Sequence, residues 1–126
     1  MANITTIIDT ILEKTTPVIK GTLKDENGAA IPAASLTTLT LTLYSMAGIK
    51  PIINARQDQN VLNTNNVTVD SNGLLTWSLQ EADTAIQATT IVNLETHRAV
   101  FAWGYGTAKK GRYIIEHTIQ NLEKVS

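Results

Sequence analysis

LTTLTLTLYSM, residues 36–46, has the clearest periodicity in the chain. Leu39, Leu41 and Leu43 alternate in it with threonines. This is the period of a β-strand with one face in a core and the other towards solvent or a partner, and it does not suit a helix. We therefore expect a half-buried strand here, in a protein built mainly from sheets.

The composition agrees with one domain made of sheets. The chain has 126 residues, 43% of them hydrophobic, which is enough for a core without a metal or disulfide. Threonine, which favours strands, occurs 19 times, and asparagine, which favours turns, occurs 10 times. The sequence has no cysteine, which excludes thiol catalysis, zinc–thiolate sites and a disulfide framework.

The distribution of charge and apolar residues argues against nucleic acid and membranes as partners. The formal net charge is −1, so no basic field attracts a phosphate backbone. The first 15 residues contain Asp9 and Glu13 and have neither a basic opening nor an unbroken apolar run, unlike a signal peptide. No segment is apolar over the length of a bilayer. We expect a protein made in the cytoplasm without oxidative folding.

The N-terminal segment has a different periodicity. Its apolar residues recur at helical spacing, and these are Ile4, Ile7, Ile8, Ile11 and Leu12. The pattern predicts a short amphipathic helix or arm over residues 3–14, which is marginal in isolation and must pack on something. Its own domain and a neighbouring subunit are the two main alternatives, and a disordered tail is the third. We divide the chain into an arm, residues 1–15, and a domain, residues 16–126.

Turn residues divide the domain into short strands. The expected strands cover residues 18–24, 36–46, 49–56, 67–70, 74–79, 95–107 and 112–122. Pro51 indicates an edge position for the third of them, and residues 57–66 are expected to form a polar loop. Residues 81–87 suit a single helical turn, and residues 88–94 are not assigned. Seven or eight short strands separated by turns predict an antiparallel β-sandwich, with a small barrel as the alternative.

Few side chains are suited to chemistry. His97 and His117 lie on neighbouring predicted strands and could meet, but no compact set of ligands completes a metal site around them. No G-x-S-x-G turn offers a nucleophile, and Gly104 and Gly106 precede no phosphate-binding helix. We expect no catalytic residue, no cofactor and no metal, so the protein is interpreted as a non-enzyme.

Basic residues indicate possible contacts with a partner. Lys109 and Lys110 belong to a basic cluster at a turn predicted over residues 108–111, which is either a solvated turn or a contact with an acidic surface. Arg98, inside a predicted strand, needs a carboxylate or an interface. The candidate interface residues are Ile4, Ile7, Ile8, Ile11, Leu12, Arg98, Lys109 and Lys110.

The order of several segments resembles one group of proteins. The segments are DENGAAIP, SLTTLTLTLYSMAG, IINARQDQNVLNTN, VTVDSNGLLTWSL, EADTAI, HRAVFAWGY and RYIIEHTIQNL, within residues 17–125. Together they resemble the small immunoglobulin-like virion proteins of tailed bacteriophages, which occupy neck, tail-adaptor, baseplate and capsid-decoration positions. The resemblance implies an Ig-like antiparallel β-sandwich and a purely architectural role in a symmetric assembly. It also implies a location in the virion, and contacts with portal, neck, tail or capsid proteins and with further copies of the chain.

A carbohydrate-binding β-sandwich that attaches to a host surface is the alternative function. Trp103 and Tyr105, two residues apart, would then form a platform on which sugar rings stack. The same spacing can equally produce a core face, so the exposure of Trp103 distinguishes the two functions. Trp77 is expected to be the central aromatic residue of the core.

Overall fold

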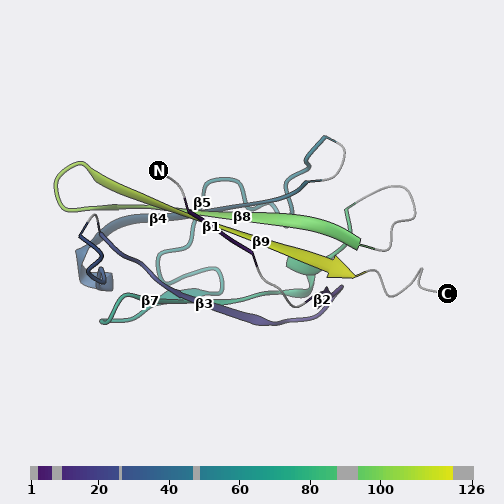
Figure 1. Cartoon of the computed structure of the whole chain (residues 1–126), viewed down its shortest axis with the longest axis horizontal. Coiled ribbons are helices and arrows are strands. Elements are labelled where there is room, and N and C mark those ends of the chain that lie inside the picture. The colour runs from purple at the N-terminus through teal and green to yellow at the C-terminus, as the bar shows by residue number, and fades with distance from the viewer. Residues whose placement is uncertain (1–2, 7–9, 26, 47–48, 88–93, 121–126) are drawn as a thin grey trace.

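The computed structural model describes residues 3–6, 10–25, 27–46, 49–87 and 94–120, and their strands form two facing layers (Figure 1). The strands are β1 (Asn3–Thr6), β2 (Ile11–Leu12), β3 (Val18–Thr22), β4 (Leu36–Ser45), β5 (Gln59–Asn60), β6 (Val67–Val69), β7 (Leu74–Ser78), β8 (Leu94–Tyr105) and β9 (Lys109–Gln120). The larger sheet has the order β1-β9-β8-β4-β5, with β2 also paired to β9, and the smaller sheet has the order β3-β7-β6. The prediction of an all-β protein is confirmed.

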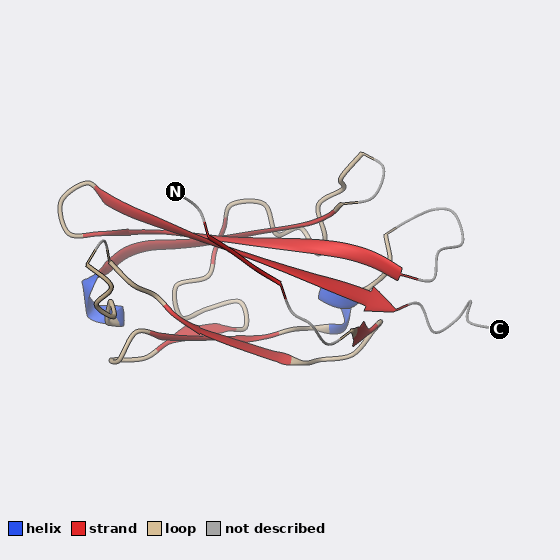
Figure 2. Cartoon of the chain, in the orientation of Figure 1, coloured by secondary structure: helices blue, strands red, loops and turns tan. Residues whose placement is uncertain are grey.

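Two short 3-10 helices complete the described elements, η1 (Ala33–Ser35) and η2 (Glu81–Thr84), and they lie at opposite ends of the molecule (Figure 2). Within the described ranges neither has the length or apolar character needed to cross a bilayer. The helical turn predicted over residues 81–87 is thus confirmed over its first half. Its capping box is formed by Gln80 and Asp83.

Alternating side chains of the larger sheet build one side of the core. Leu39, Leu41 and Leu43 of β4 are fully buried, as the alternation predicted. β4 is antiparallel to β8, which in turn pairs with β9 along the full 12 residues of each strand. In β8 the residues that face the core include Ala99 and Phe101.

Trp77 joins the two layers. It lies on β7 of the smaller sheet, is fully buried, and meets Phe101 of the larger sheet with ring centroids 5.5 Å apart in an edge-to-face arrangement. Edge-to-face pairs stabilise a core beyond the area that they bury. The prediction that Trp77 is the central aromatic is confirmed.

The helix predicted over residues 3–14 is wrong. Residues 3–6 and 11–12 are instead the strands β1 and β2, which pair in parallel with β9. Isoleucine and threonine dominate this segment, and their branched side chains favour strands over helices. The edge of β9 offers these residues interstrand backbone hydrogen bonds, so tertiary pairing overrides the helical spacing. Ile7 and Ile8 lie outside the described residues.

The strand predicted over residues 49–56 is also wrong. Ile52 forms an isolated bridge to Tyr44, and Leu43 N–H donates to the Arg56 carbonyl, but residues 49–56 form no strand. The strand that pairs with β4 is β5, inside the segment predicted as a loop. Pro51 lacks a backbone donor, and Asn54 and Ala55 have φ values of 54° and 55°, which reverse the chain. The segment therefore bends where a strand would have to continue.

The turn of the last hairpin begins two residues earlier than predicted and is one residue shorter. Its turn covers residues 106–108, where Gly106 and Ala108 have φ values of 55° and 60°. Lys109 and Lys110 therefore begin β9, opposite Tyr105 and Gly104, instead of lying in the turn.

Replacing one core leucine tests the alternation of β4. We expect Leu41→Ala to lower the free energy of unfolding by about 3 kcal/mol, because it leaves a cavity at a fully buried position. The neighbouring Thr40→Ala, on the outer face, is the control and should cost about 1 kcal/mol or less. Urea unfolding followed by tryptophan fluorescence measures both. Equal losses would contradict the assignment of the two faces.

Candidate functional site

Ionisable side chains gather between the sheets at the end of the molecule where β8 begins. His97 of β8 lies directly opposite His117 of β9, and their ring centroids are 5.7 Å apart. Glu95, two residues before His97, lies on the same inner face. All three side chains are buried. The structure therefore brings the two histidines together, as the predicted hairpin allowed.

His97 is held by Glu95. Its Nε2 lies 2.5 Å from Glu95 Oε2, which indicates that the neutral ring carries its proton on Nε2. The backbone N–H of Gln87 donates to both carboxylate oxygens of Glu95, at 2.9 and 3.1 Å. Burial lowers the pKa of His97, and the hydrogen bond and charge of Glu95 oppose this effect. Glu95 thus connects the start of β8 to the chain that follows η2.

His117 has no hydrogen-bond partner at either ring nitrogen among the described residues. Its ring instead packs edge-on against Trp77, with centroids 6.2 Å apart. Burial lowers the pKa of His117 to about 4, and the neighbouring His97 adds to this shift. The ring is therefore neutral near neutral pH and acts as a core side chain.

An ion pair lies beside the histidines and was not predicted from the sequence. Arg56 donates from Nε to Asp83 Oδ1 at 2.6 Å and from a terminal nitrogen to Oδ2 at 3.1 Å. Both side chains are buried, and Arg56 also donates to Gln59 Oε1 at 2.8 Å. Because the partners are 27 residues apart, no local spacing signals the pair. A bidentate pair of this kind fixes η2 against the chain that leads into β5.

The cluster is closed to solvent. Its charged members are paired and closed to solvent, so a substrate cannot reach them without opening the core. Among the described residues, no group of three or more His, Asp or Glu side chains is arranged to hold a metal ion.

The candidate interface residues divide between two regions. Ile11 is part of the core and pairs with Ile119, whereas Leu12 is exposed, and Ile4 lies opposite Ile114 in the register of β1. Lys109 and Lys110 are exposed at the other end of β9.

Arg98 has the carboxylate partner that its position in a strand required. It pairs with Glu116 on the adjacent strand β9, and both side chains are partly exposed. Trp103, in contrast, is only 7% exposed and lies over Gly111, where an added Cβ would come within 2.4 Å of its Nε1. The predicted sugar-stacking platform therefore lacks an exposed Trp103.

Removing half of the buried ion pair tests its role. We expect Asp83→Asn to lower the free energy of unfolding by about 3–5 kcal/mol, because it leaves the Arg56 charge buried without compensation. The double variant Arg56→Met, Asp83→Leu should be much closer to wild type, since neither charge remains. Urea unfolding compares the three proteins. A double variant as unstable as the single one would contradict this account.

The histidine cluster predicts a pH dependence of stability. The unfolded state binds the His117 proton near pH 6.5 and the folded state only near pH 4, so stability should rise with pH between these values. The contribution of this residue is about 3 kcal/mol at most. We expect His117→Phe to flatten the rise, with Thr118→Ala on the outer face as the control. Unfolding curves at a series of pH values measure it, and an unchanged slope would exclude His117 as the source.

Comparison of the chain with protein-family models, with curated proteins and with solved structures gave no match.

Proposed function

We propose that this protein is a non-enzymatic structural component of a tailed-phage virion, of the neck, head–tail or tail-adaptor type. It has an Ig-like β-sandwich fold and mediates contacts between subunits in a symmetric assembly. The observation that carries the proposal is the parallel pairing of β1 and β2 with the edge of β9.

The strand order supports the Ig-like part of the proposal. An Ig-like sandwich has one sheet with the strand order G-F-C, extended by C′ in variable-type domains, and another that contains B, E and D. If β3 to β9 are taken in chain order as B, C, C′, D, E, F and G, then β9-β8-β4-β5 and β3-β7-β6 have these orders. The sequence resemblance to phage virion proteins implied the same architecture.

The N-terminal segment supports the assembly part of the proposal. Thr15 is anchored to η2, because its N–H donates to Thr84 Oγ1 at 3.0 Å and its carbonyl accepts from that hydroxyl at 2.9 Å. Just before this anchor, Lys14 has a φ of 57°, where the chain reverses towards its own β9. The left-handed conformation costs a non-glycine residue about 1 kcal/mol.

A neighbouring copy can supply the same strands. The pairing joins backbone groups, which are identical in every copy, so β1 and β2 of one subunit are able to add to β9 of the next. Exchange of this kind relieves the reversal at Lys14 and links subunits without a new recognition surface. The buried charged cluster supports a non-enzymatic role, and the burial of Trp103 disfavours the carbohydrate-binding alternative.

The mass of the protein in solution tests the proposal. We expect the full-length protein to form oligomers at micromolar concentration, and a protein lacking residues 1–15 to be monomeric. Since that deletion also removes the buried Ile11, a milder pair of variants is needed. Lys14→Gly removes the strain of the reversal, whereas Lys14→Ala removes the same charge and keeps the strain. We expect Lys14→Gly to shift the equilibrium about fivefold towards monomer relative to Lys14→Ala.

Light scattering and sedimentation measure these masses. Monomers at every concentration, or oligomers that neither change affects, would overturn the exchange of N-terminal strands.

A further inference from the structure

The edge of β3 in the smaller sheet has no partner strand among the described elements. Hydrogen bonds from Leu79 N–H to the Pro17 carbonyl, 2.9 Å, and from Leu23 N–H to the Gly73 carbonyl, 2.9 Å, show which residues face β7. The odd-numbered residues of this segment direct their backbone groups towards β7. In an antiparallel ladder the intervening residues direct their backbone groups the other way. Val18, Lys20 and Thr22 therefore present their N–H and C=O groups at an open edge.

The edges of β9 and β6 are covered. β1 and β2 pair with the edge of β9. At β6, the outward N–H groups already have partners, since Val67 donates to the Thr64 carbonyl at 3.1 Å and Val69 to Asn63 Oδ1 at 2.7 Å. Unpaired edges invite other strands, and proteins normally block them. The open edge of β3 therefore contrasts with the protected edge at the far side of the same sheet.

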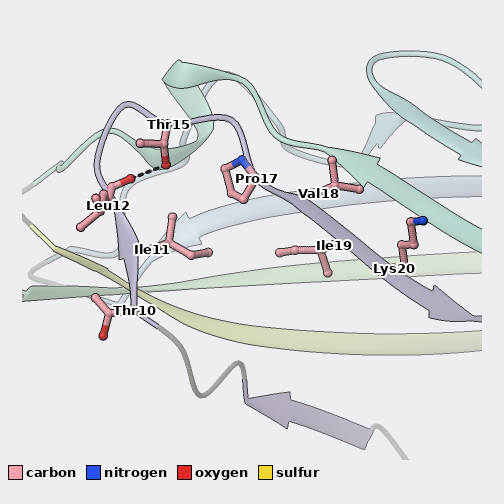
Figure 3. Close-up of a pocket in the computed structure, with 8 residues that line it drawn as sticks. All are labelled: Thr10, Ile11, Leu12, Thr15, Pro17, Val18, Ile19 and Lys20. Carbon is pink, nitrogen blue, oxygen red and sulfur yellow. Dashed lines mark hydrogen bonds between the residues drawn. The ribbon is translucent and has the colours of Figure 1, made fainter.

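A groove of about 490 Å³ lies between β3 and β2 of the opposite sheet, beside this open edge (Figure 3). Ile11 and Ile19 point into it from the two sheets (Figure 3). At its rim, Leu12 and Val18 are 43% and 54% exposed. A strand added to β3 would direct every second side chain into this apolar groove.

The positive charge of the lysines along β3 determines which kind of strand can pair with its open edge. Lys20 is exposed at the centre of the open edge, and Lys24 is exposed near its end. If two copies paired β3 with β3 about Lys20, the two lysines would lie directly opposite each other, which is unfavourable. An acidic side chain opposite Lys20 has the complementary charge.

We propose that β3 and this groove form a docking site for an extended, acidic segment of another protein, which joins the smaller sheet as an additional strand. Its backbone pairs with Val18, Lys20 and Thr22, its apolar side chains enter the groove between Ile11 and Ile19, and its acidic side chains lie beside Lys20. This inference does not depend on the proposed virion function, and it uses a different edge from the N-terminal strands.

Two synthetic peptides test the site on the full-length protein. The first is acetyl-Thr-Val-Glu-Val-Glu-Val-Thr-amide, and the second has lysine at both glutamate positions. In amide NMR spectra, we expect the acidic peptide to shift the signals of residues 18–22 and to slow hydrogen exchange at Val18, Lys20 and Thr22. The basic peptide should bind at least about fivefold more weakly.

Two variants of the protein test the charge preference and the backbone pairing separately. Lys20→Glu should reverse the preference between the peptides. Thr22→Pro removes one outward N–H without touching the ladder to β7 and should abolish binding, whereas the matched control Thr22→Val keeps the N–H and should bind. The amide spectrum of each variant shows whether it is folded.

Several results would overturn the proposal. They are equal binding or no binding of the two peptides, shifts confined to other surfaces, and a preference that Lys20→Glu leaves unchanged. A concentration-dependent dimer that Thr22→Pro alone disrupts would identify a second copy as the occupant and would also overturn it. The masses of the Lys14 variants report on the N-terminal exchange separately, so the two proposals can fail independently.

Discussion

The backbone ladder between β8 and β9 is the contact on which the rest of the structure depends. It sets His97 opposite His117 on the inner face and Arg98 opposite Glu116 on the outer face. Because side chains alternate between the faces, a slip of β9 by one residue would move His117 to solvent and Glu116 into the core. The same ladder pairs one edge of β9 over its 12 residues, and the other edge is available to β1 and β2.

Features with a local cause could be predicted from the sequence. The leucines of β4, the core position of Trp77 and the approach of the two histidines follow from two-residue alternation within strands and from a hairpin. Features with a distant cause could not. Ile4 and Ile11 occur at helical spacing, yet their conformation is decided by β9, more than a hundred residues later. The pair of Arg56 and Asp83 likewise depends on how two segments meet in space.

The asparagine-rich stretch before β6 has a structural explanation. Asn63, Asn65 and Asn66 have positive φ values, which asparagine tolerates better than most residues. Asn63 also caps an outward N–H of β6, and the side chain of Asn65 donates to the carbonyl of Asn60 in β5 at 2.8 Å. The side-chain amides thus take the place of a neighbouring strand at this side of both sheets. The abundance of asparagine in this stretch is therefore explained by these side-chain hydrogen bonds as well as by the general preference of asparagine for turns.

The parallel pairing of β1 with β9 also has a consequence for synthesis. Asn3 pairs with Tyr113, so β1 is synthesised more than a hundred residues before the strand with which it pairs. At usual rates of translation the two are separated by on the order of ten seconds. During this interval the N-terminal strand has no β9 of its own, whereas completed chains nearby already present one. The order in which the strands are made therefore gives neighbouring chains on a polysome the first opportunity to pair with it.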